Sequence, residues 1–313
     1  MGTAELACPS LAALSQWEGS DVVSVVTRPD RPRGRKLQLQ PSCVKQCAEE
    51  LGLPLQQPET LRDDVVFNTL VALEPDLVVV AAYGQILPSA VLDLPPHGCL
   101  NIHASILPRY RGAAPIQWAL LNGDNETGVT IMRMDAGLDT GDIVTEARTP
   151  IGTHDNSQTL HDRLAEMGAE LLIKTVPGYV SGNIVPQPQP KEGVSHARKI
   201  RKADGRINWD APAHELLRCI RAFTPWPGAF TELPAREERL LKIWEAEVMD
   251  GGGPAGEVIV ADESGIVVAC GEQALRVTTV QRGGGKRMAA ADFLRGCPLK
   301  SGMLLGGATS DAP

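Results

Sequence analysis

The residues of this chain best suited to chemistry are Asn101 and His103, which follow a short apolar run and are separated by one residue. In an extended strand successive side chains alternate between faces, so both would project from the same face. An imidazole that titrates near neutrality would then lie beside an amide donor. Pro108 and Gly112 end the strand in a loop. Polar residues at the carboxyl end of a buried strand are typical of ligand sites in open α/β sheets.

A second polar cluster, residues 135–142, could add a carboxylate to this pair, because its glycines permit tight turns. An amide, an imidazole and a carboxylate can together carry out acyl transfer. The amide stabilises the developing oxyanion, the imidazole takes a proton from the attacking amine, and the carboxylate orients the imidazole. The spacing leaves Asp135, Asp139 and Asp142 as alternatives for the carboxylate.

The elements that must position these residues alternate between strands and helices. Besides the strand that holds Asn101, the patterns predict strands over 22–27, 76–82, 127–134 and 143–151, and helices over 41–51, 62–73, 115–121 and 159–179. This alternation is typical of an α/β fold with a Rossmann-like, doubly wound, mostly parallel sheet. We therefore expect a catalytic domain over residues 1–183.

The character of the sequence changes after residue 183. Residues 184–204 contain three prolines and five basic side chains, so they are predicted to form an extended linker. In residues 205–302 a helical pattern over 211–222 precedes several short strand-like runs, which predict a small β-barrel of the oligonucleotide-binding (OB) type. We expect residues 303–313 to be a disordered tail.

Composition sets the class of protein. The chain has 313 residues, 43% hydrophobic and 22% charged, typical of a folded protein of about two domains. Its seven cysteines form no C-x-x-C pair, which favours reduced thiols and no structural zinc. Without a recognisable signal peptide or membrane span, we expect a cytoplasmic protein, and nothing in the sequence implies a membrane or an obligate protein partner. Nucleotide-binding glycine motifs are also absent from the sequence.

A local basic segment contrasts with the net charge of −8. The whole surface is too acidic for non-specific binding to nucleic acid. However, the loop after the first predicted strand carries five cations against the single carboxylate of Asp30: Arg28, Arg31, Arg33, Arg35 and Lys36. Such a loop is expected to be exposed and to reach phosphates.

Several stretches resemble the folate-dependent formyltransferase family. They are Asn101-x-His103, the segment Ser-Ile-Leu-Pro-x-x-Arg-Gly-Ala-Ala-Pro at 105–115, and Leu-Asp-Thr-Gly at 138–141. Supporting stretches span nearly the whole chain, at 27–32, 82–88, 128–132 and 219–227. The resemblance implies that Asn101, His103 and Asp139 are the catalytic set.

The resemblance also implies the substrates. A formyl group would pass from 10-formyltetrahydrofolate, the co-substrate, to the free amino group of methionine on initiator methionyl-tRNA, for translation initiation, without a metal. The residues implied to bind the folate are Ser105, Ile106, Leu107, Pro108, Tyr83, Gly84, Ile86 and Leu87. Those implied to bind tRNA are Arg31, Arg33, Arg35 and Lys36, together with the C-terminal domain.

Other functions remain as alternatives. The same chemistry could formylate a purine precursor or an amino sugar, or hydrolyse formyl-folate, but small substrates would not require the basic loop or the C-terminal domain. A protein that binds tRNA without catalysis is the alternative from another class. The chain also departs from the family, whose members have a central strand before the pair that is Gly2-Thr3 here. Since its loss would leave two unpaired sheet edges, we expect translation to start upstream.

Overall fold

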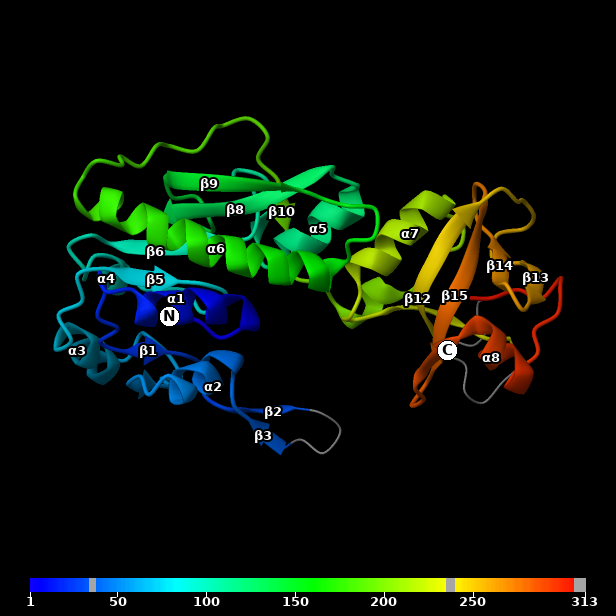
Figure 1. Cartoon of the computed structure of the whole chain (residues 1–313), viewed down its shortest axis with the longest axis horizontal. Helices are drawn as coiled ribbons and strands as arrows, with labels where there is room; N and C mark the ends of the chain where they lie inside the picture. The colour runs from blue at the N-terminus through cyan, green and yellow to red at the C-terminus, as the bar shows by residue number, and fades with distance from the viewer. Residues whose placement is uncertain (34–37, 235–239, 307–313) are drawn as a thin grey trace, which may run out of the picture. The chain divides into compact units, whose positions relative to one another are not determined.

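The computed structural model describes residues 1–33, 38–234 and 240–306, which form two compact units (Figure 1). Unit 1 comprises Met1–Ile116, Asn125–Ile151 and Thr159–Lys199, and unit 2 comprises Gln117–Asp124, Gly152–Gln158 and Ile200–Pro313. All residues of the predicted catalytic set belong to unit 1. No described helix is long and apolar enough to cross a membrane.

The main sheet of unit 1 has four strands, in the order β5 (Val78–Val80), β6 (Cys99–His103), β8 (Glu126–Arg133) and β9 (Ile143–Pro150). Strands β5 and β6 are parallel, but β6 pairs antiparallel with β8 and β8 antiparallel with β9. The prediction of a mostly parallel sheet is therefore wrong for the part of the sheet formed by β6, β8 and β9. After β8 the chain reverses through the turn at 134–142 and returns directly as β9, whereas a parallel pair requires a long crossover.

A second parallel pair, β1 (Val25–Val26) and β4 (Leu55–Gln56), lies in unit 1. The first two residues of the chain connect it to the main sheet. The Gly2 amide donates to the Val26 carbonyl (3.0 Å), the Met1 carbonyl accepts from the Ala81 amide (3.0 Å), and Gly2 forms a parallel bridge with Ala81. Met1 and Gly2 thus lie in the strand position between β1 and β5.

Helix α6 (Ser157–Val180) runs along the main sheet (Figure 1). A Cβ on Gly168 would lie 2.8 Å from Ile102 and 3.6 Å from Val129, so the helix approaches β6 and β8 closely at this glycine. Ile102 therefore faces α6, and alternation places Asn101 and His103 on the opposite face of β6. The remaining helical elements of unit 1 are η1 (Glu5–Ala7), α1 (Cys8–Gln16), α2 (Cys43–Glu50), α3 (Asp64–Val71), α4 (Ser89–Leu92) and the start of α5 (Pro115–Asn122).

Two short strand pairs complete unit 1. Strands β2 (Arg31–Arg33) and β3 (Gln38–Gln40) form an antiparallel pair. Strand β7 (Arg111–Gly112) pairs in parallel with β10 (His196–Ala197), which lies in the segment predicted to be a linker. Residues up to Lys199 therefore pack as part of unit 1.

Unit 2 is built on an antiparallel sheet that packs with α7 (Ala213–Ala222) and α8 (Ala290–Gly296) around one apolar core. Element η2 (Lys202–Gly205) precedes α7. The strand order is β11 (Ala229–Glu232), β12 (Leu240–Met249), β15 (Ala274–Arg282), β14 (Gly265–Ala269) and β13 (Val258–Asp262), with β16 (Arg287–Ala289) paired to β15.

The sheet of unit 2 is not a closed barrel, because β11 and β13 do not pair within the described residues. Residues 303–306 instead form backbone hydrogen bonds near both edge strands, at the start of β13 and at the end of β11. The Val258 amide donates to the Met303 carbonyl, the Leu305 amide to the Gly256 carbonyl, and the Gly306 amide to the Glu232 carbonyl. This part of the predicted tail is hydrogen-bonded to the sheet, and residues 307–313 lie outside the described chain.

Candidate functional site

The structure brings Asn101, His103 and Asp139 together. Asn101 and His103 lie on β6, 9% and 6% exposed, and Asp139 lies in the turn between β8 and β9. Asn101 Nδ2 donates to Asp139 Oδ1 (3.5 Å), and His103 Nδ1 lies 3.8 Å from Asp139 Oδ2. An amide, an imidazole and a carboxylate therefore meet at one end of the strand.

The environment of His103 defines which ring nitrogen can accept a proton. Its Nε2 lies 2.9 Å from the carbonyl oxygen of Tyr110. Because a carbonyl oxygen only accepts, Nε2 carries the hydrogen, and the neutral ring has its lone pair on Nδ1. That lone pair is on the nitrogen nearest Asp139. A proton taken up at Nδ1 would therefore be stabilised by the carboxylate.

The turn selects Asp139 among the three carboxylates that the sequence leaves open. Asp139 has a left-handed backbone (φ 51°), and its Oδ2 accepts a hydrogen bond from the Gly112 amide (2.7 Å). Asp135 is exposed and bonds within the turn, to Thr140 Oγ1 and the Gly137 amide. Asp142 is exposed as well. Gly141 is required because a Cβ there would lie 1.8 Å from the Arg133 carbonyl oxygen.

The predicted folate segment after β6, residues 105–108, is held by hydrogen bonds to Thr130 of β8, which is fully buried. Thr130 Oγ1 donates to the Ser105 carbonyl (2.7 Å) and accepts from the Leu107 amide (3.1 Å). Ser105, Leu107 and Pro108 are buried, whereas Ile106 is half-buried. Ile106 is therefore the member of this segment with the most accessible surface.

The other predicted folate segment follows β5, whose carboxyl end lies beside that of β6, with Val80 opposite Asn101. Tyr83 and Leu87 are buried in an apolar cluster of unit 1. Burial raises the pKa of the Tyr83 hydroxyl to about 12. Gly84 is exposed and Ile86 is 78% exposed, so these two are accessible to a ligand.

The predicted tRNA residues are only partly described. Arg31 begins the β2–β3 pair and forms an exposed ion pair with Glu59 (2.6 Å). Arg35 and Lys36 lie outside the described residues, as does the side chain of Arg33. The guanidinium of Arg28, the remaining cation of this basic segment, lies 3.3 Å from where a Cβ on Gly84 would be.

Sequence reasoning missed several residues that build the site. Ser195 Oγ accepts from the Tyr110 amide (2.9 Å), and the Arg111 amide donates to the Ser195 carbonyl. Gln189 binds both Arg111 and the backbone of the Asp139 turn. Arg111 lies within the family-like segment, but Ser195 and Gln189 lie in a proline-rich stretch whose local pattern indicates only extended chain.

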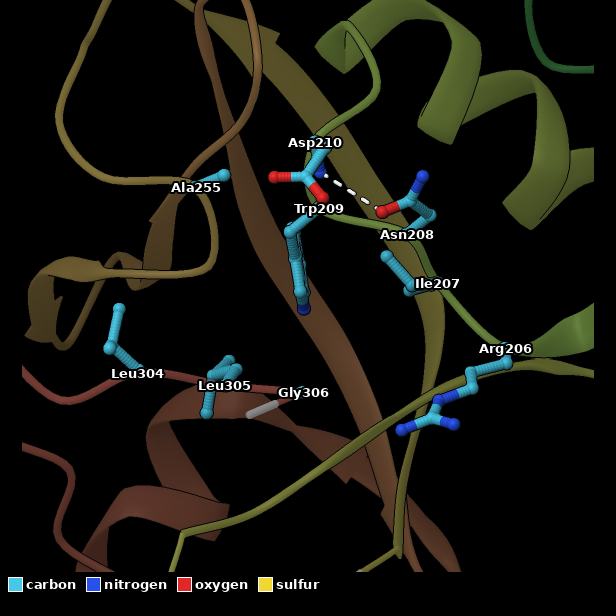
Figure 2. A pocket seen from close by; sticks show the side chains of 9 residues that line it. All are labelled: Arg206, Ile207, Asn208, Trp209, Asp210, Ala255, Leu304, Leu305 and Gly306. Carbon is cyan, nitrogen blue, oxygen red and sulfur yellow. Dashed lines mark hydrogen bonds between the residues drawn. The ribbon is translucent and has the colours of Figure 1, made fainter. Parts of the chain in front are cut away.

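A cavity of about 380 Å³ lies in unit 2 and contains none of the predicted site residues. Its buried lining is Ile207, Trp209 and Leu305, and exposed Asn208 and Asp210 lie at the same cavity (Figure 2). The Trp209 indole N–H is already bonded to Thr231. Within the described chain no group of three or more His, Cys, Asp or Glu side chains is arranged to hold a metal ion.

Comparison with known proteins assigns the chain. Residues 2–176 match the family model described as "Formyl transferase", and residues 199–298 match "Formyl transferase, C-terminal domain". The chain belongs to the formyl transferase family. The candidate site of this formyl transferase lies within the first match, except for the segment that contains Gln189 and Ser195.

Relatives of this formyl transferase include a protein named methionyl-tRNA formyltransferase from Citrifermentans bemidjiense, 47% identical over 98% of this chain and 95% of the relative. Among solved structures, the sugar 3N-formyl transferase WlaRD matches with a TM-score of 0.62 at 20% identity, over 88% of this chain and 95% of that chain. HypX from Aquifex aeolicus matches with a TM-score of 0.58 at 18% identity, over 80% of this chain and 43% of that chain. The two structures establish a shared fold.

Proposed function

We propose that this formyl transferase moves the formyl group of 10-formyltetrahydrofolate to the free amino group of methionine on initiator methionyl-tRNA. The observation that carries the proposal is the 47% identity to a methionyl-tRNA formyltransferase over 98% of this chain. That similarity includes both the catalytic unit and the C-terminal unit. As an enzyme of translation initiation, the protein would work in the cytoplasm.

The three grouped side chains supply the chemistry that this reaction needs. As the methionine nitrogen attacks the formyl carbon, Asn101 would donate to the developing oxyanion with the amide hydrogen not directed at Asp139. His103 Nδ1 would take the proton from the attacking nitrogen. Asp139 would stabilise the imidazolium. On collapse of the tetrahedral intermediate, His103 would return the proton to the departing folate nitrogen, so the residues end the cycle as they began it.

The two loops beside the catalytic set would hold the folate. Of the eight proposed residues, Gly84, Ile86 and Ile106 are accessible enough to contact it directly. Ile86 would offer the folate an exposed apolar side chain. Tyr83, Leu87, Ser105, Leu107 and Pro108 are buried, so we infer that they shape the pocket from behind.

The proposed tRNA surface combines two regions. Arg31, Arg33, Arg35 and Lys36 would contact phosphates of the acceptor end. We further infer that residues 205–302 act as an OB-like domain that contacts the tRNA. Residues 184–204 then connect a catalytic domain, residues 1–183, to that domain, and on the way they contribute Gln189 and Ser195 to the site.

A formylation assay with charged initiator tRNA and 10-formyltetrahydrofolate tests the function. Formyl-methionyl-tRNA should form with the parent protein and fall to a low level with His103→Ala. A second arm replaces the tRNA with a nucleotide-linked amino sugar. Formylation of the sugar alone, or tRNA binding without formylation, would overturn the proposal.

A further inference from the structure

Gln189 lies on an extended segment that returns to the site after α6. It is half-buried, while the flanking Pro188 and Pro190 are exposed. Its Nε2 donates to the Asp139 carbonyl oxygen (2.9 Å) and to the Gly141 carbonyl oxygen (2.7 Å). Its Oε1 accepts from Arg111 Nε (3.1 Å) and from Arg111 Nη2 (2.6 Å).

The chemistry of these partners fixes the orientation of the Gln189 amide. Arginine can only donate and a carbonyl oxygen can only accept, so Oε1 must face Arg111 and Nε2 must face the turn. Both N–H groups and both acceptor positions of the amide are then used. Glutamate would keep the arginine contact but has no donor for the two carbonyl oxygens.

These four bonds act on the carboxylate of Asp139 from two directions. On one side they hold the backbone of Asp139 itself, in a left-handed conformation that a residue with a Cβ rarely adopts. On the other side they hold Arg111, and the next residue, Gly112, donates its amide hydrogen to Asp139 Oδ2. The carboxylate is thereby fixed where it meets Asn101 and His103.

We propose that Gln189 is a positioning residue for formyl transfer, which acts by holding Asp139 in register with His103. This inference rests on the proposed function for its catalytic consequence, but its structural part can be measured without any substrate. Gln189 touches none of the three proposed catalytic side chains through its own amide, since its contacts in the turn are to backbone oxygens.

The kinetic test compares Gln189→Glu and Gln189→Ala with Gln187→Ala. Gln187 is an exposed neighbour whose side chain donates to the Val185 carbonyl, so it is a matched control. Both Gln189 variants should lower kcat by about 10- to 100-fold, the scale of a small displacement of a catalytic group. The KM values for folate and tRNA should stay within about twofold because binding surfaces are intact. Equal kcat in parent and Gln189→Glu would overturn the proposal.

A double variant shows whether Gln189 acts through Asp139. Asp139→Asn combined with Gln189→Ala should be no slower than Asp139→Asn alone, because the second change removes support from a carboxylate that is already gone. If the two effects multiply, Gln189 acts elsewhere and the proposal fails.

Hydrogen exchange gives a readout that does not depend on activity. Loss of the Gln189 bonds should speed exchange of the Gly112 amide hydrogen by about tenfold or more, since its acceptor is the Asp139 carboxylate. Gln187→Ala should leave it unchanged. Unchanged exchange in Gln189→Ala would overturn the positioning role. An inactive parent protein would instead overturn the proposed function, so the two failures are distinguishable.

Discussion

His103 donates a hydrogen bond from Nε2 to the carbonyl oxygen of Tyr110, seven residues further along the chain, at 2.9 Å. Tyr110 adopts a left-handed backbone (φ 61°), and its amide is held by Ser195. The loop after β6 thus folds back to bind the imidazole that β6 presents. One ring nitrogen holds the ring in place, and the other, Nδ1, is the nitrogen that we propose takes the proton.

The first prediction concerns the imidazole of His103. His103→Ala should lower turnover by about 10²-fold or more, the usual scale for loss of a general acid or base. His103→Gln retains a hydrogen-bonding side chain but cannot accept and release a proton near neutrality, so it should be similarly slow. Single-turnover formylation with saturating substrates measures the effect. Parent-like turnover in either variant would remove His103 from the proton transfer.

The second prediction separates the carboxylates of the turn. Asp139→Asn removes the negative charge beside His103 while keeping an oxygen that can accept from the Gly112 amide. We expect a loss of kcat of about 10²-fold, because the imidazolium is no longer stabilised. Asp142→Asn, at an exposed position of the same turn, is the control and should retain near-parent kcat. Comparable losses in both variants would contradict the assignment of Asp139.

The third prediction distinguishes two neighbours in the proposed folate loop. Leu87 is 5% exposed within an apolar cluster, so Leu87→Ala should lower the free energy of unfolding by about 2–5 kcal/mol. Ile86 is 78% exposed, so Ile86→Ala should change the free energy of unfolding by no more than about 0.5 kcal/mol. Its expected effect is a higher KM for 10-formyltetrahydrofolate.

Urea unfolding and initial-rate kinetics on the two variants measure these quantities. An Ile86→Ala protein with unchanged KM for the folate would show that the loop does not contact it. A strongly destabilised Ile86→Ala would contradict the exposed position of that side chain.

The fourth prediction concerns the basic residues Arg33, Arg35 and Lys36. Replacing Arg33, Arg35 and Lys36 together by Ala should raise the KM for tRNA and leave the KM for folate unchanged. The slope of log KM against log salt concentration should flatten by about one for each phosphate that the variant no longer neutralises. Formylation rates measured across a salt series test this. A slope equal to that of the parent would place the tRNA elsewhere.

The sequence predicts the periodic elements of this fold well. The expected helix over 159–179 is observed as Ser157–Val180, and the expected strand over 127–134 as Glu126–Arg133. Long patterns of buried side chains determine such elements locally. By contrast, the pairing direction of β8 has no local signal, because a buried strand alternates in the same way in a parallel or an antiparallel sheet. Helix α1 (Cys8–Gln16) has no counterpart among the predicted helices. Its small and apolar residues define no clear buried face, so the local pattern does not indicate a helix.

The site shows the same limit. The spacing of Asn101 and His103 is sufficient to place them on one face, because side chains two residues apart in a strand project from the same face. The choice among Asp135, Asp139 and Asp142 depends on how the turn folds, which spacing alone does not determine. Gln189 is 50 residues from the Asp139 oxygen that it binds. Contacts of that range have no signature in a single sequence.

The pairing of β7 with β10 has a consequence for how members of such a family can exchange parts. The first matched region ends at residue 176, within α6, and only after that helix does the chain supply the residues that bind Arg111 and Tyr110. In a chimera joined directly after α6, the turn that holds Asp139 would come from one parent and the segment that contains Gln189 from the other. Recombination between relatives would separate these partners when a crossover falls between Gly112 and Gln189, and would keep them matched when it falls before Tyr110 or beyond Ala197, the residue at which the pairing with β7 ends.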